Sequence, residues 1–290
     1  SRLSQAEELY QRSLTNPESV LGELDVVVSN LKCGLTETVE SPLLAARVQM
    51  VASKTLRQLT FLSTPIEELV GYQQELIEVV EARQKKLNAA ARAERMTGIT
   101  RLLEAAQLNT LQSLQTLWSI PKEADWVSFL NLYPQFITES TSPDLTYQYL
   151  THVERILNRY EKRATDHIGD LRPPLTADEP LVRQQAIDVL TTLATTDPTT
   201  AADYVSDVVS LLGSSRTELT VAALSVCHEL VTTAPELITS FSDEIRERLS
   251  SDLRIVRWKA LQTVSIHPHI ADSRTQQLLT EVTRALDASD

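Results

Sequence analysis

The C-terminal part of the chain repeats its apolar pattern every 37 residues, and this periodicity restricts the fold more than any other feature. On the first half of each repeat the matching positions are Val182, Leu219 and Val256, then Ala186, Ala223 and Ala260, then Ile187, Leu224 and Leu261. On the second half they are Tyr204, Phe241 and Leu278, then Val208, Ile245 and Val282, then Leu212, Leu249 and Leu286. Spacings of four and five residues place each set on one face of a helix. The pattern therefore predicts three consecutive pairs of helices.

Proline and small polar residues mark the predicted turns. Within the pairs the turns contain Asp197-Pro198, Ala234-Pro235 and His267-Pro268, because proline suits the first turn of a new helix. Between the pairs, Gly213-Ser214-Ser215 and Ser250-Ser251-Asp252 supply helix-stop and N-cap residues. We expect repeats at about 176–213, 214–250 and 251–290.

Four residues of the first repeat carry a family resemblance. Asp178, Val182, Arg183 and Ala186 recur in the third repeat as Asp252, Val256, Arg257 and Ala260. This pattern resembles the Asp, Val-Arg, Ala signature of HEAT repeats, which belong to the armadillo-like α-solenoids. The middle repeat departs from it, with Ser215, Leu219 and Thr220 where Asp, Val and Arg are expected. The resemblance covers about residues 176–290, and it implies an architecture that hosts many unrelated activities.

Each residue of this signature has a structural interpretation. The Asp is expected to cap the first helix of its pair, and the Ala to let neighbouring helices approach closely. The Arg lies on the adjacent face and is expected to reach a neighbouring cap. These roles concern folding, so the signature alone predicts no activity.

Upstream of residue 171 the period fades, although helical patterning persists. We predict one pair of long helices at 43–61 and from 66 to about 96, a further helix at 99–117, another from 145 to about 168, and a proline-containing connector at 170–179. The predicted fold is therefore all-α: an α-solenoid of stacked antiparallel helix pairs with longer N-terminal helices. The predicted domains are 1–170, either degenerate helix pairs or a separate bundle, and 171–290, the three repeats.

The composition of the chain indicates in which compartment the protein works. No apolar run approaches the roughly 20 residues that cross a bilayer, and the two cysteines, Cys33 and Cys227, lack metal-ligand spacing. We therefore expect a soluble protein in the cytoplasm. Arg outnumbers Lys by 20 to 7, and with abundant Thr this balance resembles proteins from salt-loving archaea. The chain begins at Ser1 rather than Met, as a part of a longer protein would.

Catalytic motifs are nearly absent from the sequence. There is no phosphate-binding Gly-rich loop, Gly-x-Ser-x-Gly, His-Glu-x-x-His or Cys-x-x-Cys motif, and the chain has only 6 glycines. His228-Glu229 is similar to the dipeptides of HEAT-like di-iron hydroxylases, but those enzymes carry several on successive repeats. We predict that the protein is not an enzyme and that it needs no metal or cofactor.

Acidic residues suggest where a partner binds. In HEAT arrays the second helix of each pair commonly lines the concave side. Its polar positions here include Asp203, Asp207, Asp243, Glu244, Glu247 and Glu281. Such a surface would attract a protein partner with a basic segment. Arg257 and Trp258 could add a binding hot spot, although the simpler interpretation is that Trp258 fills space between helices beside Ala260.

Two stretches rich in basic residues occur in a chain whose net charge is −12. The first comprises Arg83, Lys85, Lys86, Arg92, Arg95 and Arg101, which we interpret as a solvated helix face. The second comprises Arg155, Arg159, Lys162 and Arg163, whose spacing on a continuous helix would form one basic strip for anions.

The predicted function is that of a non-catalytic scaffold or adaptor for protein partners. The alternative is nucleic-acid binding through the basic strip, including lesion processing as in HEAT-like DNA glycosylases, whose basic surface this sequence lacks. Regulation of a small GTPase is a third class, and no residue selects it.

Overall fold

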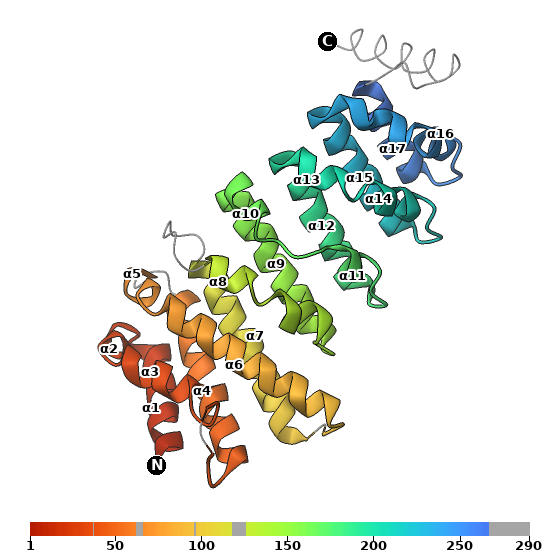
Figure 1. Cartoon of the computed structure of the whole chain (residues 1–290). Coiled ribbons are helices and arrows are strands. Elements are labelled where there is room, and N and C mark those ends of the chain that lie inside the picture. The colour runs from red at the N-terminus through yellow and green to blue at the C-terminus, as the bar shows by residue number, and fades with distance from the viewer. Residues whose placement is uncertain (37, 62–65, 96, 118–125, 267–290) are drawn as a thin grey trace. The chain divides into compact units, whose positions relative to one another are not determined.

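The computed structural model describes residues 1–36, 38–61, 66–95, 97–117 and 126–266, and these form helices and turns without any strand (Figure 1). Contacts between Cα atoms divide the chain into two compact units. Unit 1 comprises residues 1–159 and 167–169, and unit 2 comprises 160–166 and 170–290. Within the described residues, no helix is both long and apolar enough to cross a membrane. The all-α prediction is confirmed, while the predicted domain limits stay a prediction.

Unit 1 is built from successive pairs in which a long first helix is followed by a shorter or broken second one. Its elements are α1 (Arg2–Thr15), α2 (Glu18–Leu21), α3 (Leu24–Leu31), α4 (Pro42–Phe61), α5 (Ile66–Val70), α6 (Gln73–Arg92), α7 (Gly98–Leu117), α8 (Trp126–Leu130), η1 (Pro134–Thr138) and α9 (Pro143–Tyr160). The first helices α1, α4 and α7 pack on one another in sequence. The second helices α3 and α6 pack against the first helix of the following pair, which is the arrangement of a solenoid.

The predicted second helix at 66–96 is wrong in its continuity and its end. It breaks at Gly71 and Tyr72, whose N–H groups bond to carbonyls three residues back and so close a turn between α5 and α6. Helix α6 ends at Arg92 because Glu94 adopts a left-handed conformation with φ of 54°. The N–H of Arg95 then bonds to the carbonyl of Ala90 at 3.0 Å, which is a Schellman ending.

A polar network lies inside unit 1 and corrects the interpretation of Arg83 as a solvated residue. Arg83 on α6 is fully buried, and its guanidinium donates to Gln49 Oε1 on α4 at 2.9 Å and to Thr110 Oγ1 on α7 at 2.9 Å. Gln107 Oε1 accepts a third bond at 3.2 Å, and the carbonyl of Leu31 on α3 accepts a fourth at 3.4 Å. Burial lowers the pKa of Arg83 to about 9, so the side chain remains cationic at neutral pH.

An aromatic cluster holds α8, η1 and α9 together. Tyr149 of α9 stacks on Phe129 and Phe136, with ring centroids 5.3 and 5.0 Å away, and its hydroxyl donates to the carbonyl of Leu130 at 2.7 Å. His152, one turn later, lies 5.0 Å from the ring of Phe129 and is fully buried. Burial, followed by the nearby charge of Arg155, lowers the pKa of His152 to about 3.

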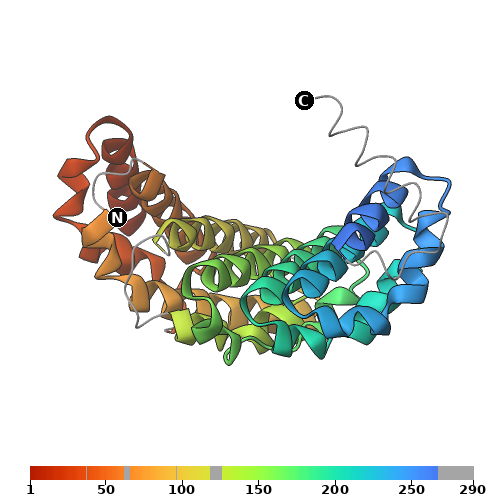
Figure 2. The ribbon, with the colours of Figure 1, turned by 90° about the horizontal axis from the view of Figure 1, so that it is seen from above.

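Unit 2 repeats one helix pair at the predicted period. Its elements are α10 (Lys162–Thr165), α11 (Arg172–Leu175), α12 (Pro180–Thr196), α13 (Pro198–Ala202), α14 (Val205–Leu212), α15 (Thr217–Thr233), η2 (Pro235–Ser240), α16 (Ser242–Leu249) and α17 (Arg254–Ile266). The first helices α12, α15 and α17 begin at residues 180, 217 and 254, and the second helices α14 and α16 begin at 205 and 242, so each offset is 37. The period is confirmed, and the two layers of helices in unit 2 can be followed in Figure 2.

Most of the predicted core of unit 2 is buried where the structure describes it, but Leu249 and Leu261 are only half-buried. Ala186, Ala223 and Ala260 have no exposed surface, and the first helices that carry them, α12, α15 and α17, pack on one another in sequence. Tyr204, Phe241, Val208 and Ile245 of the second helices are buried as well. The second helix predicted for the third repeat, with Leu278, Val282 and Leu286, lies outside the described residues.

The helix starts of unit 2 differ from the signature prediction. The N-cap of α12 is Glu179, without a side-chain capping bond, so the predicted capping by Asp178 is wrong. Instead, Ser214 Oγ and Ser251 Oγ, one repeat apart, accept the N–H groups of Arg216 and Leu253 at 3.2 Å. Arg257 Nη1 donates to the carbonyl of Ser251 at 2.6 Å, just before its own helix rather than at a neighbouring cap.

The predicted helix at 145–168 is wrong in its continuity. Helix α9 ends at Tyr160, because Glu161 adopts a left-handed conformation with φ of 49° and ψ of −135°. The single turn α10 follows, and the connector at 170–179 contains another turn, α11. Asp197, at the end of α12, accepts hydrogen bonds from Thr165 of α10 and from Thr199 and Thr200 of α13. Burial by itself would raise the pKa of the Asp197 carboxyl. The hydrogen bonds outweigh that effect, and the pKa is lowered to about 2.

The Arg83 network predicts a large effect of one substitution. In Arg83→Met the apolar length is kept, but the buried oxygens of Gln49, Gln107 and Thr110 lose a donor. We expect the free energy of unfolding to fall by about 3 kcal/mol in urea denaturation. Lys85→Met, at an exposed position of the same helix, is the control and should change it by less than about 0.5 kcal/mol. Equal stability of the two variants would contradict the network's role.

His152 predicts how stability depends on pH. Its pKa is about 3 in the folded protein and 6.5 when exposed, so below pH 6.5 the unfolded chain binds a proton that the folded chain does not. The stability from neutral His152 is complete above that pH and is lost as pH falls. We expect wild type to lose about 2 kcal/mol more than His152→Gln between pH 7 and pH 5. Parallel pH curves for the two proteins would contradict this assignment.

Candidate functional site

The predicted acidic residues of unit 2 lie on adjoining second helices. Asp203 follows α13, Asp207 lies on α14, and Asp243, Glu244 and Glu247 lie on α16. Helices α14 and α16 contact each other, so the fold brings these residues onto one layer. Glu281 lies outside the described residues. We call Asp203, Asp243, Glu244 and Glu247 the acidic surface of unit 2.

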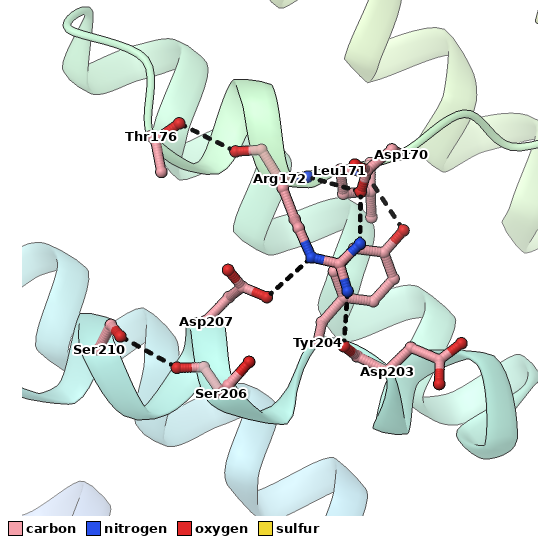
Figure 3. Close-up of polar contacts among 9 residues, drawn as sticks. All are labelled: Asp170, Leu171, Arg172, Thr176, Asp203, Tyr204, Ser206, Asp207 and Ser210. Atoms are coloured by element: carbon pink, nitrogen blue, oxygen red, sulfur yellow. Dashed lines mark hydrogen bonds and ion pairs between the residues drawn. The ribbon is translucent and has the colours of Figure 1, made fainter.

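Asp207 is excluded from that surface because Arg172 binds it. The guanidinium of Arg172, on α11, lies 3.4 Å from Asp207 Oδ2 and 3.2 Å from Asp170 Oδ1 (Figure 3). Its Nη2 donates to the backbone carbonyl of Asp203 at 2.9 Å, and its carbon Cζ lies 5.0 Å from the centroid of the Tyr204 ring. The Tyr204 hydroxyl accepts the N–H of Leu171 at 3.3 Å. Arg172 therefore ties the connector to the second helix of the first repeat.

The carboxylate of Asp203 points away from this cluster, as Figure 3 shows, and is exposed. Only the backbone carbonyl of Asp203 takes part in the Arg172 contacts. Asp203 is therefore available for a partner in a way that Asp207 is not.

The charge of α16 is partly neutralised within the helix itself. Arg246 Nη1 lies 2.8 Å from Asp243 Oδ1, and Arg248 Nη2 lies 3.6 Å from Glu247 Oε2. The Asp243 side chain is 86% exposed, so this pair is a weak surface interaction that a partner could replace. Glu244 has no ion pair among the described residues, and its charge raises the pKa of the buried Cys227 thiol further after burial itself.

Arg257 and Trp258 differ in their availability. Arg257 is half-buried and donates to the Ser251 carbonyl, so its side chain supports the turn before α17. Trp258 is 55% exposed, and the interpretation that it fills space between helices is wrong for the described residues. Its neighbour Ile255 is also exposed. A binding role of Trp258 stays a prediction.

The predicted basic strip is divided between two helices. Arg155 and Arg159 lie on α9, whereas Lys162 and Arg163 lie on α10, beyond the left-handed Glu161. The helical spacing that predicted one strip therefore does not apply across residue 161. Arg155 Nη1 donates to the carbonyl of Gln115 on α7 at 3.3 Å. Anion binding by the four residues stays a prediction.

Sequence reasoning missed a groove on the first helices of unit 1. It has a volume of about 600 Å³ and lies among α1, α4 and α7. We call it the α4 groove. Its lining residues are Tyr10, Met50, Lys54, Arg57, Gln58, Phe61, Ala105, Leu108, Asn109 and Gln112. Phe61, an apolar residue at the end of α4, was a partial signal in the sequence. The groove itself forms only because three helices far apart in the sequence pack together.

Residues suited to metal binding or nucleophilic chemistry do not converge in the described part of the chain. No group of three or more His, Cys, Asp and Glu side chains there could hold a metal ion. His228 and Glu229 lie on α15. Cys33 and Cys227 are buried free thiols, and burial raises the pKa of Cys227 far above its ordinary range.

Comparisons with known proteins identify the fold of the chain and no further property of it. No family model matches the chain, and no curated protein matches its sequence. Among solved structures, it is similar to the crystal structure of an engineered protein, a Northeast Structural Genomics Consortium target, with a TM-score of 0.53 and 17% sequence identity. The match covers 84% of this chain and 97% of the engineered one. Together with the stacked helix pairs, this likeness defines the chain as an all-α solenoid.

The Arg172 contacts predict a measurable contribution to stability. Arg172→Ala removes two ion pairs, one backbone hydrogen bond and the contact with the Tyr204 ring, all on a half-exposed side chain. We expect a loss of about 1 kcal/mol in urea denaturation, with faster hydrogen exchange in residues 170–176. Arg246→Ala, which removes one exposed pair within α16, should cost less than about 0.5 kcal/mol. If both variants lost the same stability, the connector would not depend on Arg172.

Proposed function

We propose that the chain is a non-catalytic scaffold of HEAT-like repeats that binds a protein partner with a basic segment along the acidic surface of unit 2. The HEAT assignment is supported by the recurrence of Val182, Arg183 and Ala186 as Val256, Arg257 and Ala260. It is supported further by first helices that begin 37 residues apart and by a fully buried alanine at the same position of each.

The observation that carries the binding proposal is the position of Glu244. Glu244 stands one repeat after Asp207, which forms an ion pair with Arg172, but one repeat after Arg172 the chain has Val209. The charge of the second repeat is therefore left for a partner. Asp203 and Asp243 add exposed carboxylates on the same layer. Clustered carboxylates attract a basic segment and raise its association rate.

The proposal that the protein is non-catalytic rests on where its perturbed groups lie. The strongest pKa shifts belong to Arg83, Tyr149, His152 and Cys227, and all four are fully buried in the helical core. A catalytic group needs contact with a substrate as well as an altered pKa. These shifts are therefore explained by packing.

Nucleic-acid binding is the weaker candidate because its predicted strip is divided at Glu161. Affinity for a phosphate backbone comes from clustered cations, and the chain has a net charge of −12. A fluorescent DNA duplex at low salt separates the two functions. Binding that weakens steeply with salt and depends on Arg155 and Lys162 would favour the nucleic-acid function over the scaffold function.

The scaffold proposal is tested by reversing the charge of α16. Partners are captured from native lysate after nuclease treatment and identified, and each purified partner is then titrated against Asp243→Lys, Glu244→Lys, Glu247→Lys in one chain. We expect at least about a tenfold loss of affinity, because attraction becomes repulsion at three positions.

The matched control changes three exposed acidic residues of unit 1, Glu8, Glu68 and Glu78, to Lys. The net charge shifts equally, so a general charge effect would weaken both variants. Unchanged affinity of the α16 variant for every captured partner would refute the acidic surface as the binding site.

A further inference from the structure

The α4 groove differs in charge from the rest of the protein. Lys54 and Arg57 are exposed on α4, and none of the ten lining residues is acidic, although the chain carries 39 acidic and 27 basic residues. The neighbouring carboxylate of Glu104 on α7 accepts a hydrogen bond from Ser142 and lines another pocket. The groove is therefore a cationic site on an acidic protein.

One of its cations is held in place. Arg57 Nη1 donates to Asn109 Oδ1 at 3.2 Å, and the amide of Asn109 donates to Ser53 Oγ at 3.2 Å. Asn109 is buried on α7, so the bond fixes the guanidinium against the wall of the groove. A fixed guanidinium loses little side-chain entropy when a carboxylate binds it.

The groove also offers apolar surface. Phe61, at the end of α4, is 82% exposed and is the most exposed large apolar side chain in the described part of the chain. Met50, Ala105 and Leu108 supply apolar lining beside it. Methionine adapts its shape to different ligands, and exposed aromatic rings anchor many interfaces. The volume of about 600 Å³ falls in the range of pockets that hold drug-sized ligands.

We propose that the α4 groove binds an acidic segment of a partner protein that carries an apolar side chain. Carboxylates of the segment pair with Arg57 and Lys54, and its apolar side chain packs against Phe61, Met50 and Leu108. A single-stranded nucleic acid would also present negative charge and flat rings. It requires cations along its backbone, however, and the lining supplies two.

The two binding surfaces are independent. The α4 groove lies within unit 1 and takes an acidic segment, whereas the acidic surface lies within unit 2 and takes a basic one. Loss of groove binding leaves the proposed scaffold function standing, and the converse also holds.

The test selects short random peptides from a display library on the full-length wild-type chain. Fluorescent copies of the retained peptides are titrated by anisotropy against wild type, Lys54→Glu with Arg57→Glu, and Phe61→Ser. We expect enrichment of Asp and Glu together with one large apolar residue. Each groove variant should bind these peptides at least about tenfold more weakly, because one lost hot-spot contact has that effect.

Matched controls separate the groove from general effects. Lys85→Glu with Arg95→Glu makes the same change in net charge at exposed positions of unit 1 outside the groove, and Leu181→Ser removes an exposed apolar residue of unit 2. Both should bind the peptides as wild type does, and circular dichroism should show that all variants are folded.

Three results would overturn the proposal. They are selected peptides without an acidic excess, selected peptides that bind the groove variants as tightly as wild type, and a library that yields no binder. Oligothymidylate is titrated in parallel. Its binding with the same dependence on Lys54, Arg57 and Phe61, in the absence of peptide binding, would assign the groove to nucleic acid instead.

Discussion

The structure depends on one constraint: a single helix pair cannot bury its own apolar faces, so each pair must be covered by the next. In unit 2 the first helices contact one another in sequence, and each carries a fully buried alanine at the same repeat position, Ala186, Ala223 or Ala260. The acidic surface is a consequence of that packing. The apolar residues of the second helices complete the shared core, and exposed polar residues such as Asp243 and Glu247 are left facing solvent.

Unit 1 meets the same constraint with an apolar core that encloses a polar network. Arg83 joins α3, α4, α6 and α7 through four hydrogen bonds to neutral acceptors. Such a network is costly when incomplete, so it favours one arrangement of these helices over alternatives of similar packing. The α4 groove depends on this arrangement, because its walls come from α1, α4 and α7, whose relative register must be kept.

The fold was predictable from residue patterns where the pattern repeats, and less so elsewhere. The period of apolar residues identified the helix pairs of unit 2, because burial of one face imposes that spacing. The break at Glu161 carried no signal, since Glu seldom adopts positive φ and only tertiary packing selects it. Arg83 was misread because local sequence shows neighbouring charges but not the Gln and Thr side chains that solvate it. Of the candidate sites, Asp243 and Arg246 could have been paired by their spacing, whereas the α4 groove required three distant helices.

The two cores also imply different capacities for change in length. The interfaces of unit 2 use equivalent elements, since α15 contacts α17 as α12 contacts α15 and each of these helices carries a fully buried alanine at the same repeat position. A duplicated segment of 37 residues could therefore be inserted there with compatible surfaces on both sides. In unit 1 an inserted pair would separate Arg83 from its acceptors on the adjacent helices and leave a buried charge unsolvated. Lengthening by duplication is thus open to one half of the chain and closed to the other.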